Sequence, residues 1–237
     1  MKKYALVTGS GDRIGKSVAL HLAKQGYSLL LHYNSSVEKA EKVKAEILNY
    51  GVDAEIFRAN FLEDNDYYKL LTDFKNKGIT LEILVNCASD FRPSNFQDEG
   101  KELLEKELKI NFENAYLLTK AFAKVYDKGI IINFIDTKVA KNHTVHLDYL
   151  LSKKLLKEFT KIAAVELGPN FRVCGIAPGL ILPPVDKDEN YLLNLAQNIP
   201  LKTIGNLEEI NKALQFIIDS YFFTGQILYI DGGEHLI

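Results

Sequence analysis

Three side chains capable of acid–base chemistry lie close together in the middle of the sequence. Tyr149 and Lys153 stand four residues apart, and Asp136 precedes Tyr149 by thirteen residues. On a helix, positions i and i+4 share one face, so we expect the phenol and the ammonium to lie side by side. An adjacent ammonium should lower the pKa of Tyr149, which would let the phenol exchange a proton near neutral pH.

Length, charge and composition bound the protein that must position these groups. The chain has 237 residues, of which 47% are hydrophobic, which predicts one large domain spanning residues 1–237. The 29 basic and 31 acidic residues nearly cancel, so nothing indicates a nucleic-acid or membrane-surface partner. Cys87 and Cys174 do not make a disulfide framework, which favours a reduced cytoplasm. No Cys/His cluster has zinc spacing, so we expect no metal site.

Short apolar runs alternate with longer periodic segments along the chain. The runs predict buried strands over Tyr4–Thr8, Ser28–Tyr33, Ala54–Arg58, Leu81–Asn86, Ile130–Ile135, Arg172–Ala177 and Gln226–Ile230. Helical spacing appears around Ile14–Ala23 and Ala40–Leu48, over Gly100–Lys124 and over Leu147–Leu167. This alternation predicts an α/β fold, namely a Rossmann-type, doubly wound parallel sheet of about seven strands with helices on both faces.

The region from Pro183 to Pro200 is the least regular part of the sequence. It predicts a loop with a short helix, and residues 180–200 are the candidate substrate loop. We expect Leu180–Pro183 to line the mouth of a pocket and Asp186–Gln197 to close over it.

A glycine-rich turn follows the first predicted strand. Gly9, Gly11 and Gly15 lie between that strand and the first helix, although their spacing departs from the usual G-x-G-x-x-G. Glycines let the main chain approach a pyrophosphate, and the helix N-terminus presents free N–H groups to it. The turn therefore predicts a dinucleotide cofactor; the alternative is a plain strand-to-helix turn.

The end of the second strand should decide between NADH and NADPH. An acidic side chain there would bind a ribose 2′-hydroxyl and repel a 2′-phosphate. This chain has none before Glu38; its residues at that point are His32, Tyr33, Asn34 and Ser35. Arg13 can supply a charge-assisted contact to a phosphate, so we predict NADPH.

Six ordered motifs resemble the short-chain dehydrogenase/reductase family over essentially the whole chain. They are the turn Thr8–Gly15, Asn86-Cys87-Ala88-Ser89, Asn111, the pair Tyr149 and Lys153, Pro178-Gly179 and Asp231-Gly232-Gly233. This resemblance implies a homotetramer, with Asn111 joining Tyr149 and Lys153 in the active site.

Three departures from the common family pattern resemble its pteridine reductase branch, which includes dihydromonapterin and dihydrofolate reductase-like members. Asp136 stands where the family usually has serine, Ser89 replaces a glycine, and Arg13 replaces the middle glycine of the turn. Ala88-Ser89-x-Phe91 and His32-Tyr33 also match that branch. The resemblance implies that Phe91 stacks on a pterin ring and sandwiches it against the nicotinamide.

The resemblance also implies a full set of site residues. The expected cofactor contacts are Gly9, Gly11, Arg13, Ile14, His32, Tyr33, Asn34, Ser35, Asn60, Asn86, Ala88, Ser89, Tyr149, Lys153, Pro178, Gly179 and Leu180. The expected substrate contacts are Ser89, Phe91, Asp136, Tyr149 and Leu180, and the expected catalytic residues are Asp136, Tyr149, Lys153 and Asn111.

These residues predict hydride transfer from NADPH to a C=N bond of a dihydropterin or a related folate. Tyr149 would donate or relay the proton, and Asp136 would orient Tyr149 or the amino-pyrimidine edge of the substrate. The carboxylate should raise the pKa of Tyr149 against the effect of Lys153, which suits an acid and hence reduction. Two alternatives stay open: a carbonyl reductase acting on a 3-oxoacyl thioester, and a non-catalytic NADP(H)-binding regulator.

Overall fold

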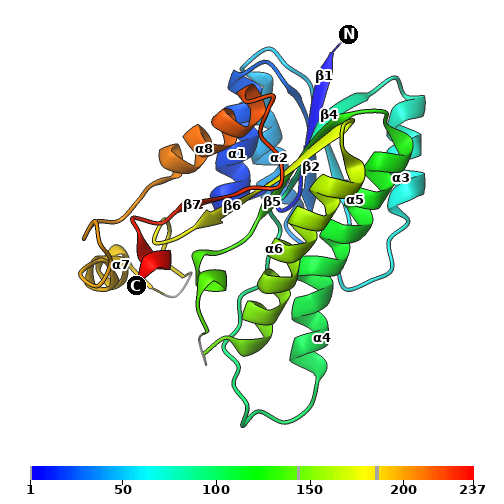
Figure 1. The fold of residues 1–237 in the computed structure, drawn as a ribbon. Coiled ribbons are helices and arrows are strands. Elements are labelled where there is room, and N and C mark those ends of the chain that lie inside the picture. The colour runs from blue at the N-terminus through cyan, green and yellow to red at the C-terminus, as the bar shows by residue number, and fades with distance from the viewer. Residues whose placement is uncertain (1, 143–144, 185–186) are drawn as a thin grey trace.

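The computed structural model describes residues 2–142, 145–184 and 187–237, and they form one parallel sheet between two layers of helices (Figure 1). The sheet order is β3-β2-β1-β4-β5-β6-β7, with every neighbouring pair parallel. The strands are β1 (Lys3–Val7), β2 (Ser28–Tyr33), β3 (Ala54–Arg58), β4 (Thr80–Asn86), β5 (Gly129–Phe134), β6 (Phe171–Pro178) and β7 (Ile227–Ile230). The predicted doubly wound fold is confirmed, and each strand boundary lies within one residue of its prediction.

Helices cover both faces of this sheet. They are α1 (Arg13–Lys24), α2 (Val37–Leu48), α3 (Tyr67–Asn76), α4 (Glu102–Leu108), α5 (Asn114–Val125), α6 (Leu147–Leu167), α7 (Glu189–Ala196) and α8 (Leu207–Asp219). In Figure 1, α1, α2 and α8 lie on one face, and α3, α5 and α6 lie on the other. The sequence patterns predict neither α3 nor α8; each begins with a polar cap, Asp66 and Asn206 respectively.

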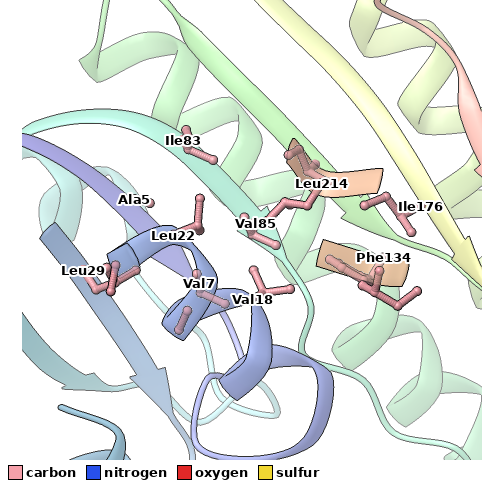
Figure 2. Packing of buried hydrophobic residues seen from close by; sticks show 14 of the residues in the cluster. Ala5, Val7, Val18, Leu22, Leu29, Ile83, Val85, Phe134, Ile176 and Leu214 are labelled. Atoms are coloured by element: carbon pink, nitrogen blue, oxygen red, sulfur yellow. The ribbon is translucent and has the colours of Figure 1, made fainter. Parts of the chain in front are cut away.

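Strand side chains alternate between two hydrophobic clusters. On β1, Ala5 and Val7 pack towards α1 and α8, whereas Leu6 packs towards α5 and α6. Figure 2 shows the first cluster, in which Val18 and Leu22 of α1 meet strand residues. Because both faces are buried, the strands read as continuous apolar runs, and each buried leucine contributes roughly 1.5–3 kcal/mol.

The single helix predicted over Gly100–Lys124 is wrong in one respect. After α4, residues Lys109–Glu113 form a π-helical turn before α5 begins. The main-chain N–H of Asn114 and its side-chain Nδ2 both donate to the Lys109 carbonyl, which stabilises the wider turn. Such turns are frequent at functional sites, and this one contains Asn111.

The strand order reverses between β1 and β4, and the loops that follow these strands meet at their carboxyl ends. In open α/β sheets ligands bind at this reversal. The loop after β6 also lies at this edge and leads into α7, so the predicted loop with a short helix is confirmed. Asp186, where the predicted closing segment begins, lies outside the described residues. Across the described ranges, no helix has the length and apolar character needed to cross a membrane.

Candidate active site

The turn after β1 is packed against the loop after β4. Thr8 Oγ1 accepts hydrogen bonds from the main-chain N–H groups of Cys87 at 2.9 Å and Ala88 at 3.0 Å. Gly9 has a φ of +66°, and a Cβ there would lie 2.9 Å from the Ala88 Cα. A Cβ on Gly15 would overlap the Gly9 carbonyl oxygen. Only glycine fits these two positions, and the resulting turn opens onto the N-terminus of α1, as a dinucleotide cradle requires.

The buried ring of His32 holds this turn through hydrogen bonds. Its Nδ1 accepts the Gly9 N–H at 3.0 Å, so its Nε2–H donates to the Ala59 carbonyl at 2.9 Å. Burial lowers the pKa of His32 to about 4, which keeps the ring neutral. Both ring nitrogens are therefore used within the protein and give the His32 ring a positioning role, while the predicted cofactor contact by His32 stays a prediction.

Arg13 makes a contact that the sequence did not predict, and its predicted contact with the cofactor stays a prediction. Its guanidinium donates to the Pro183 carbonyl at 2.7 Å, which connects the cofactor turn to the substrate loop rather than to Asn34 or Ser35. Arg13 has a φ of +52°, a conformation that costs roughly 1–2 kcal/mol for a residue with a Cβ. The family usually has glycine at this position, and glycine adopts a positive φ readily. The strain at Arg13 therefore marks a position of functional interest.

Two other cations lie beside the end of β2. Arg58 Nε donates to the Asn34 carbonyl at 3.1 Å, and Lys39, in the first turn of α2, pairs with Asp12 at 2.6 Å. Ser36 begins α2 without a side-chain cap, which leaves N–H groups of that helix for another acceptor. The exposed Asn34 and Ser35 thus lie among positive charges, although Asp12 offsets part of them.

The predicted Tyr149, Lys153 and Asp136 come together where β5 and α6 meet. The Tyr149 hydroxyl donates to Asp136 Oδ2 at 2.7 Å, and Lys153 Nζ donates to the Phe134 carbonyl at 2.9 Å. Asp136 Oδ1 accepts the Lys138 N–H at 2.7 Å, so both carboxylate oxygens accept from the protein. Tyr149 is 5% exposed and Lys153 is 2% exposed.

Two opposite effects on the pKa of Tyr149 were expected, a lowering by Lys153 and a raising by Asp136, and the structure agrees with the second. Burial, then the charge of Asp136 and its hydrogen bond, raises the pKa of Tyr149 well above its usual range. The predicted lowering of this pKa by Lys153 is wrong, because burial and Asp136 outweigh it, while the Lys153 ammonium donates to the Phe134 carbonyl. Burial also lowers the pKa of Lys153 to about 8, against the opposing charge of Asp136. Tyr149 is therefore a neutral O–H donor, as an acid should be.

Asn111 organises the loop after β4. Its Oδ1 accepts from the Ser89 hydroxyl at 2.8 Å and from the Asp90 N–H at 2.9 Å. Its Nδ2 donates to Glu107, to the Ser152 hydroxyl at 3.1 Å and to the Asp90 carbonyl at 3.1 Å. The predicted catalytic asparagine is thus 1% exposed and holds the segment that carries Ser89 and Phe91.

Phe91 presents an aromatic surface next to the reacting group. It is 39% exposed, and its ring meets the Tyr149 ring edge-on at a centroid distance of 4.7 Å. The His146 imidazole stacks on Phe91 at 3.9 Å, and the Lys138 ammonium lies 5.9 Å from the Phe91 ring centroid. An aromatic ring beside a proton donor can orient a flat heteroaromatic substrate.

The other predicted cofactor contacts vary in their surroundings. Gly179 donates its N–H to the Ile230 carbonyl at 3.0 Å, which places Pro178, Gly179 and Leu180 at the carboxyl end of β6. No group in the described part of the chain donates to the buried Oδ1 of Asn86, so this oxygen can still accept a hydrogen bond. Asn60 bonds its own turn through Leu62 and Glu63. Gly11 and Tyr33 flank the turn and the end of β2, and the Ile14 side chain packs against the core beneath α1.

Sequence reasoning missed three residues at this edge. Glu107 is buried beneath Asn111, and His146 stacks on Phe91. The buried Oε2 of Glu234 lies next to Gly179 and has no hydrogen-bond partner among the residues that the structure describes. Glu107 was detectable in principle, because it lies four residues before Asn111 at an inward position of the predicted helix. His146 and Glu234 carry no such signal, because each reaches the site from a turn whose path depends on the whole fold.

A Rossmann-type sheet with a glycine turn at its reversal and a buried Tyr–Lys–Asn group defines a nicotinamide-dependent oxidoreductase. Residues 9–235 match the family model described as Enoyl-(Acyl carrier protein) reductase. The chain belongs to the short-chain dehydrogenase/reductase family, whose members use NAD(P)H.

Individual relatives divide between two chemistries. The chain is 30% identical to the 3-oxoacyl-[acyl-carrier-protein] reductase FabG of Staphylococcus aureus (strain N315), over 100% of this chain and 99% of the relative. It is 27% identical to FabG of Staphylococcus epidermidis (strain ATCC 12228 / FDA PCI 1200), with 100% of both covered. Among solved structures, FolM Alternative dihydrofolate reductase 1 from Brucella suis, in complex with NADP, superposes with a TM-score of 0.92 at 27% identity, over 99% of this chain and 95% of that one.

Proposed function

We propose that this protein reduces a C=N bond of a pterin, dihydropterin or dihydrofolate with hydride from NADPH. The observation that carries the proposal is the Asp136 carboxylate bonded to the Tyr149 hydroxyl, where most family members have a serine. A pterin offers an amino-pyrimidine edge with N–H donors, and a carboxylate is a suitable acceptor for them. The similarity to FolM supports this assignment.

The residues would divide the work as follows. Bound NADPH would supply the hydride. The glycine turn and Pro178–Leu180 would hold the NADPH where the strand order reverses. Phe91 would stack on the substrate ring, and the buried Tyr149 O–H would deliver the proton to the reduced nitrogen. Lys153 would hold the nicotinamide ribose, and Asp136 would keep the Tyr149 hydroxyl oriented and protonated.

A second candidate is reduction of a 3-oxoacyl thioester, which the similarity to FabG favours. A ketone oxygen that becomes an alkoxide needs hydrogen-bond donors around it. Asp136 accepts from Tyr149 and from the Lys138 N–H, and an ionised carboxylate has no hydrogen to donate. This position therefore weighs against a ketone substrate.

The deciding experiment follows NADPH oxidation with dihydrobiopterin, dihydromonapterin, dihydrofolate and an acetoacetyl thioester. We expect turnover with the pterins or the folate, and loss of that turnover in Asp136→Ser. Turnover with the thioester alone would overturn the proposal. Tight NADPH binding without turnover on any of the four would instead support the regulatory alternative, which the buried Tyr149–Lys153–Asn111 group disfavours.

The preference for NADPH would depend on Lys39 and Arg58, the cations beside Asn34. We expect Arg58→Ala to weaken NADPH binding several-fold while leaving NADH binding nearly unchanged, since only NADPH carries the 2′-phosphate. Equal weakening of both cofactors would assign Arg58 a structural role. The wider proposal places a homotetramer in the cytoplasm, and light scattering of the purified protein tests the assembly.

A further inference from the structure

A buried carboxylate lies beneath the active site without a place in the mechanism above. Glu107 is 0% exposed, although the surrounding residues of α4 alternate between partly buried and exposed positions. Its Oε2 accepts from Asn111 Nδ2, and its Oε1 accepts from the Arg92 main-chain N–H at 3.1 Å. Burying a carboxylate is costly unless its oxygens are satisfied, so this position demands an explanation.

The two hydrogen bonds connect Glu107 to both ends of one loop. Asn111 holds Ser89 and the Asp90 main chain, while Glu107 itself holds the Arg92 main chain. Phe91 lies between these anchors. Glu107 therefore holds this loop directly at Arg92 and, through Asn111, at Ser89 and Asp90, beside the separate ion pair of Asp90 with Lys106.

We propose that Glu107 is a positioning residue whose ionised form fixes the Ser89–Arg92 loop, and that protonation of Glu107 releases the loop. This inference deepens the proposed function by explaining how the Phe91 surface is held. Both oxygens face N–H donors, so the site needs two acceptors, which only an ionised carboxylate supplies. A proton on either oxygen creates an O–H donor that competes with the N–H it faces.

Burial and the charges around Glu107 set the pH at which this protonation takes place. Burial, then the charge of Asp90, raises the pKa of Glu107 to about 7, while its bonds to Asn111 and Arg92 and the charge of Lys106 act in the opposite direction. Asp90 itself is paired with Lys106 at 2.6 Å and Arg92 at 3.2 Å. Tyr149 and Lys153, on α6, also lie within electrostatic reach. The transition therefore falls within the working pH range of an enzyme.

Hydrogen exchange of the unmodified protein tests the loop without any substrate. The Asp90 and Arg92 amides bond this network, whereas the Cys87 and Ala88 amides bond the Thr8 hydroxyl, which does not titrate, and act as an internal control. After correction for intrinsic rates, we expect protection of residues 90 and 92 to fall about tenfold between pH 8 and pH 6. Protection of residues 87 and 88 should not change. Parallel behaviour of the two pairs would overturn the proposal, whatever the substrate proves to be.

Glu107→Gln supplies the second arm, because glutamine presents one donor and one acceptor like a protonated carboxyl. Glu105→Gln, on the exposed face of the same helix and paired with Lys101, is the matched control. We expect Glu107→Gln to show low protection at every pH and about a tenfold higher KM for the pterin, with a smaller change in kcat. A protection change that persists in Glu107→Gln would assign that change to another group and refute the role of Glu107.

Discussion

The cofactor turn after β1 and the reaction corner, formed by Tyr149, Asp136, Lys153 and Glu107, lie at the same edge of the sheet but are built from different groups. The turn after β1 uses main-chain atoms, two sterically required glycines and a His32 ring that burial keeps neutral. The corner around Tyr149 instead gathers Asp136, Lys153 and Glu107, whose charges act on one another across a few side chains.

This difference separates binding from chemistry. A phosphate cradle made of main-chain N–H groups keeps its shape at any pH at which His32 stays neutral, because none of its own donors titrates. A proton donor must change its protonation state during the reaction, so its environment has to be adjustable. Substitutions in the turn should therefore act through shape, and substitutions in the corner should act through pH and turnover.

The largest effect is expected at the reaction corner, from Tyr149→Phe. This change removes the proton donor, so we expect kcat to fall about 10²–10⁴-fold, with NADPH affinity within about threefold of wild type. Stopped-flow turnover and fluorescence titration of NADPH measure the two quantities.

Tyr126→Phe is the matched control for Tyr149. Tyr126 is also buried, and its hydroxyl donates to the Ile79 carbonyl at 3.2 Å, away from the reaction corner. It should lose about 1 kcal/mol of stability and no activity. Equal losses of activity in both variants would mean that Tyr149 acts only through packing.

The turn should respond to shape alone, which Gly15→Ala tests. A Cβ at this position would overlap the Gly9 carbonyl, so the turn must move, at a cost of roughly 1–3 kcal/mol. Urea denaturation without cofactor measures this loss. Gly11→Ala is the control, because its Cβ would meet nothing nearer than 3.5 Å. Similar stability of the two alanine variants would contradict the steric account.

Much of the fold and of the reaction corner could be predicted from the sequence, for physical reasons. Strands buried on both faces read as apolar runs, so β1 to β7 could be bounded to within one residue. Tyr149 and Lys153 lie on one helix, where spacing alone determines which side chains share a face. The contact of Tyr149 with Asp136 needed only the short path from the end of β5 to α6.

Long-range and electrostatic features could not be predicted in the same way. The bond from Arg13 to Pro183 joins residues 170 positions apart, and its direction depends on the path of the substrate loop. Similarly, the pKa of Tyr149 depends on burial and on the charge of Asp136, neither of which helical spacing specifies. The π-helical turn at Asn111 depends on the Asn114 side chain finding the Lys109 carbonyl.

The buried His32 bonds the cofactor turn, and the reaction corner contains the buried Glu107. These two groups should make the folding stability depend on pH in opposite directions. The folded pKa of His32 is depressed to about 4, so its contribution is present above pH 6.5 and is lost as pH falls towards 4. The folded pKa of Glu107 is raised to about 7, so the folded protein holds an extra proton, and stability falls as pH rises from 4.5 to 7. Each effect is at most roughly 3 kcal/mol and the two nearly cancel in wild type.

Variants separate the two effects. The stability of wild type minus that of Glu107→Gln should decrease as pH rises from 4.5 to 7, and the corresponding difference for His32→Asn should increase from pH 4 to 6.5. Urea denaturation at several pH values measures both, with Glu105→Gln as a surface control. Differences that do not change with pH would show that neither group titrates with the predicted shift.

The smallest effect is expected at Arg13, which connects the cofactor turn to the substrate loop. Glycine at this position relieves the strain of a φ of +52° but adds freedom to the unfolded chain and loses the bond to Pro183. We therefore expect Arg13→Gly to change stability by less than about 1 kcal/mol, whereas Arg13→Ala, which keeps the strain, should be less stable than Arg13→Gly by about 1 kcal/mol. Neither variant should alter the ratio of NADPH to NADH affinity, because the guanidinium faces the substrate loop. A selective loss of NADPH affinity in both would instead return Arg13 to the 2′-phosphate.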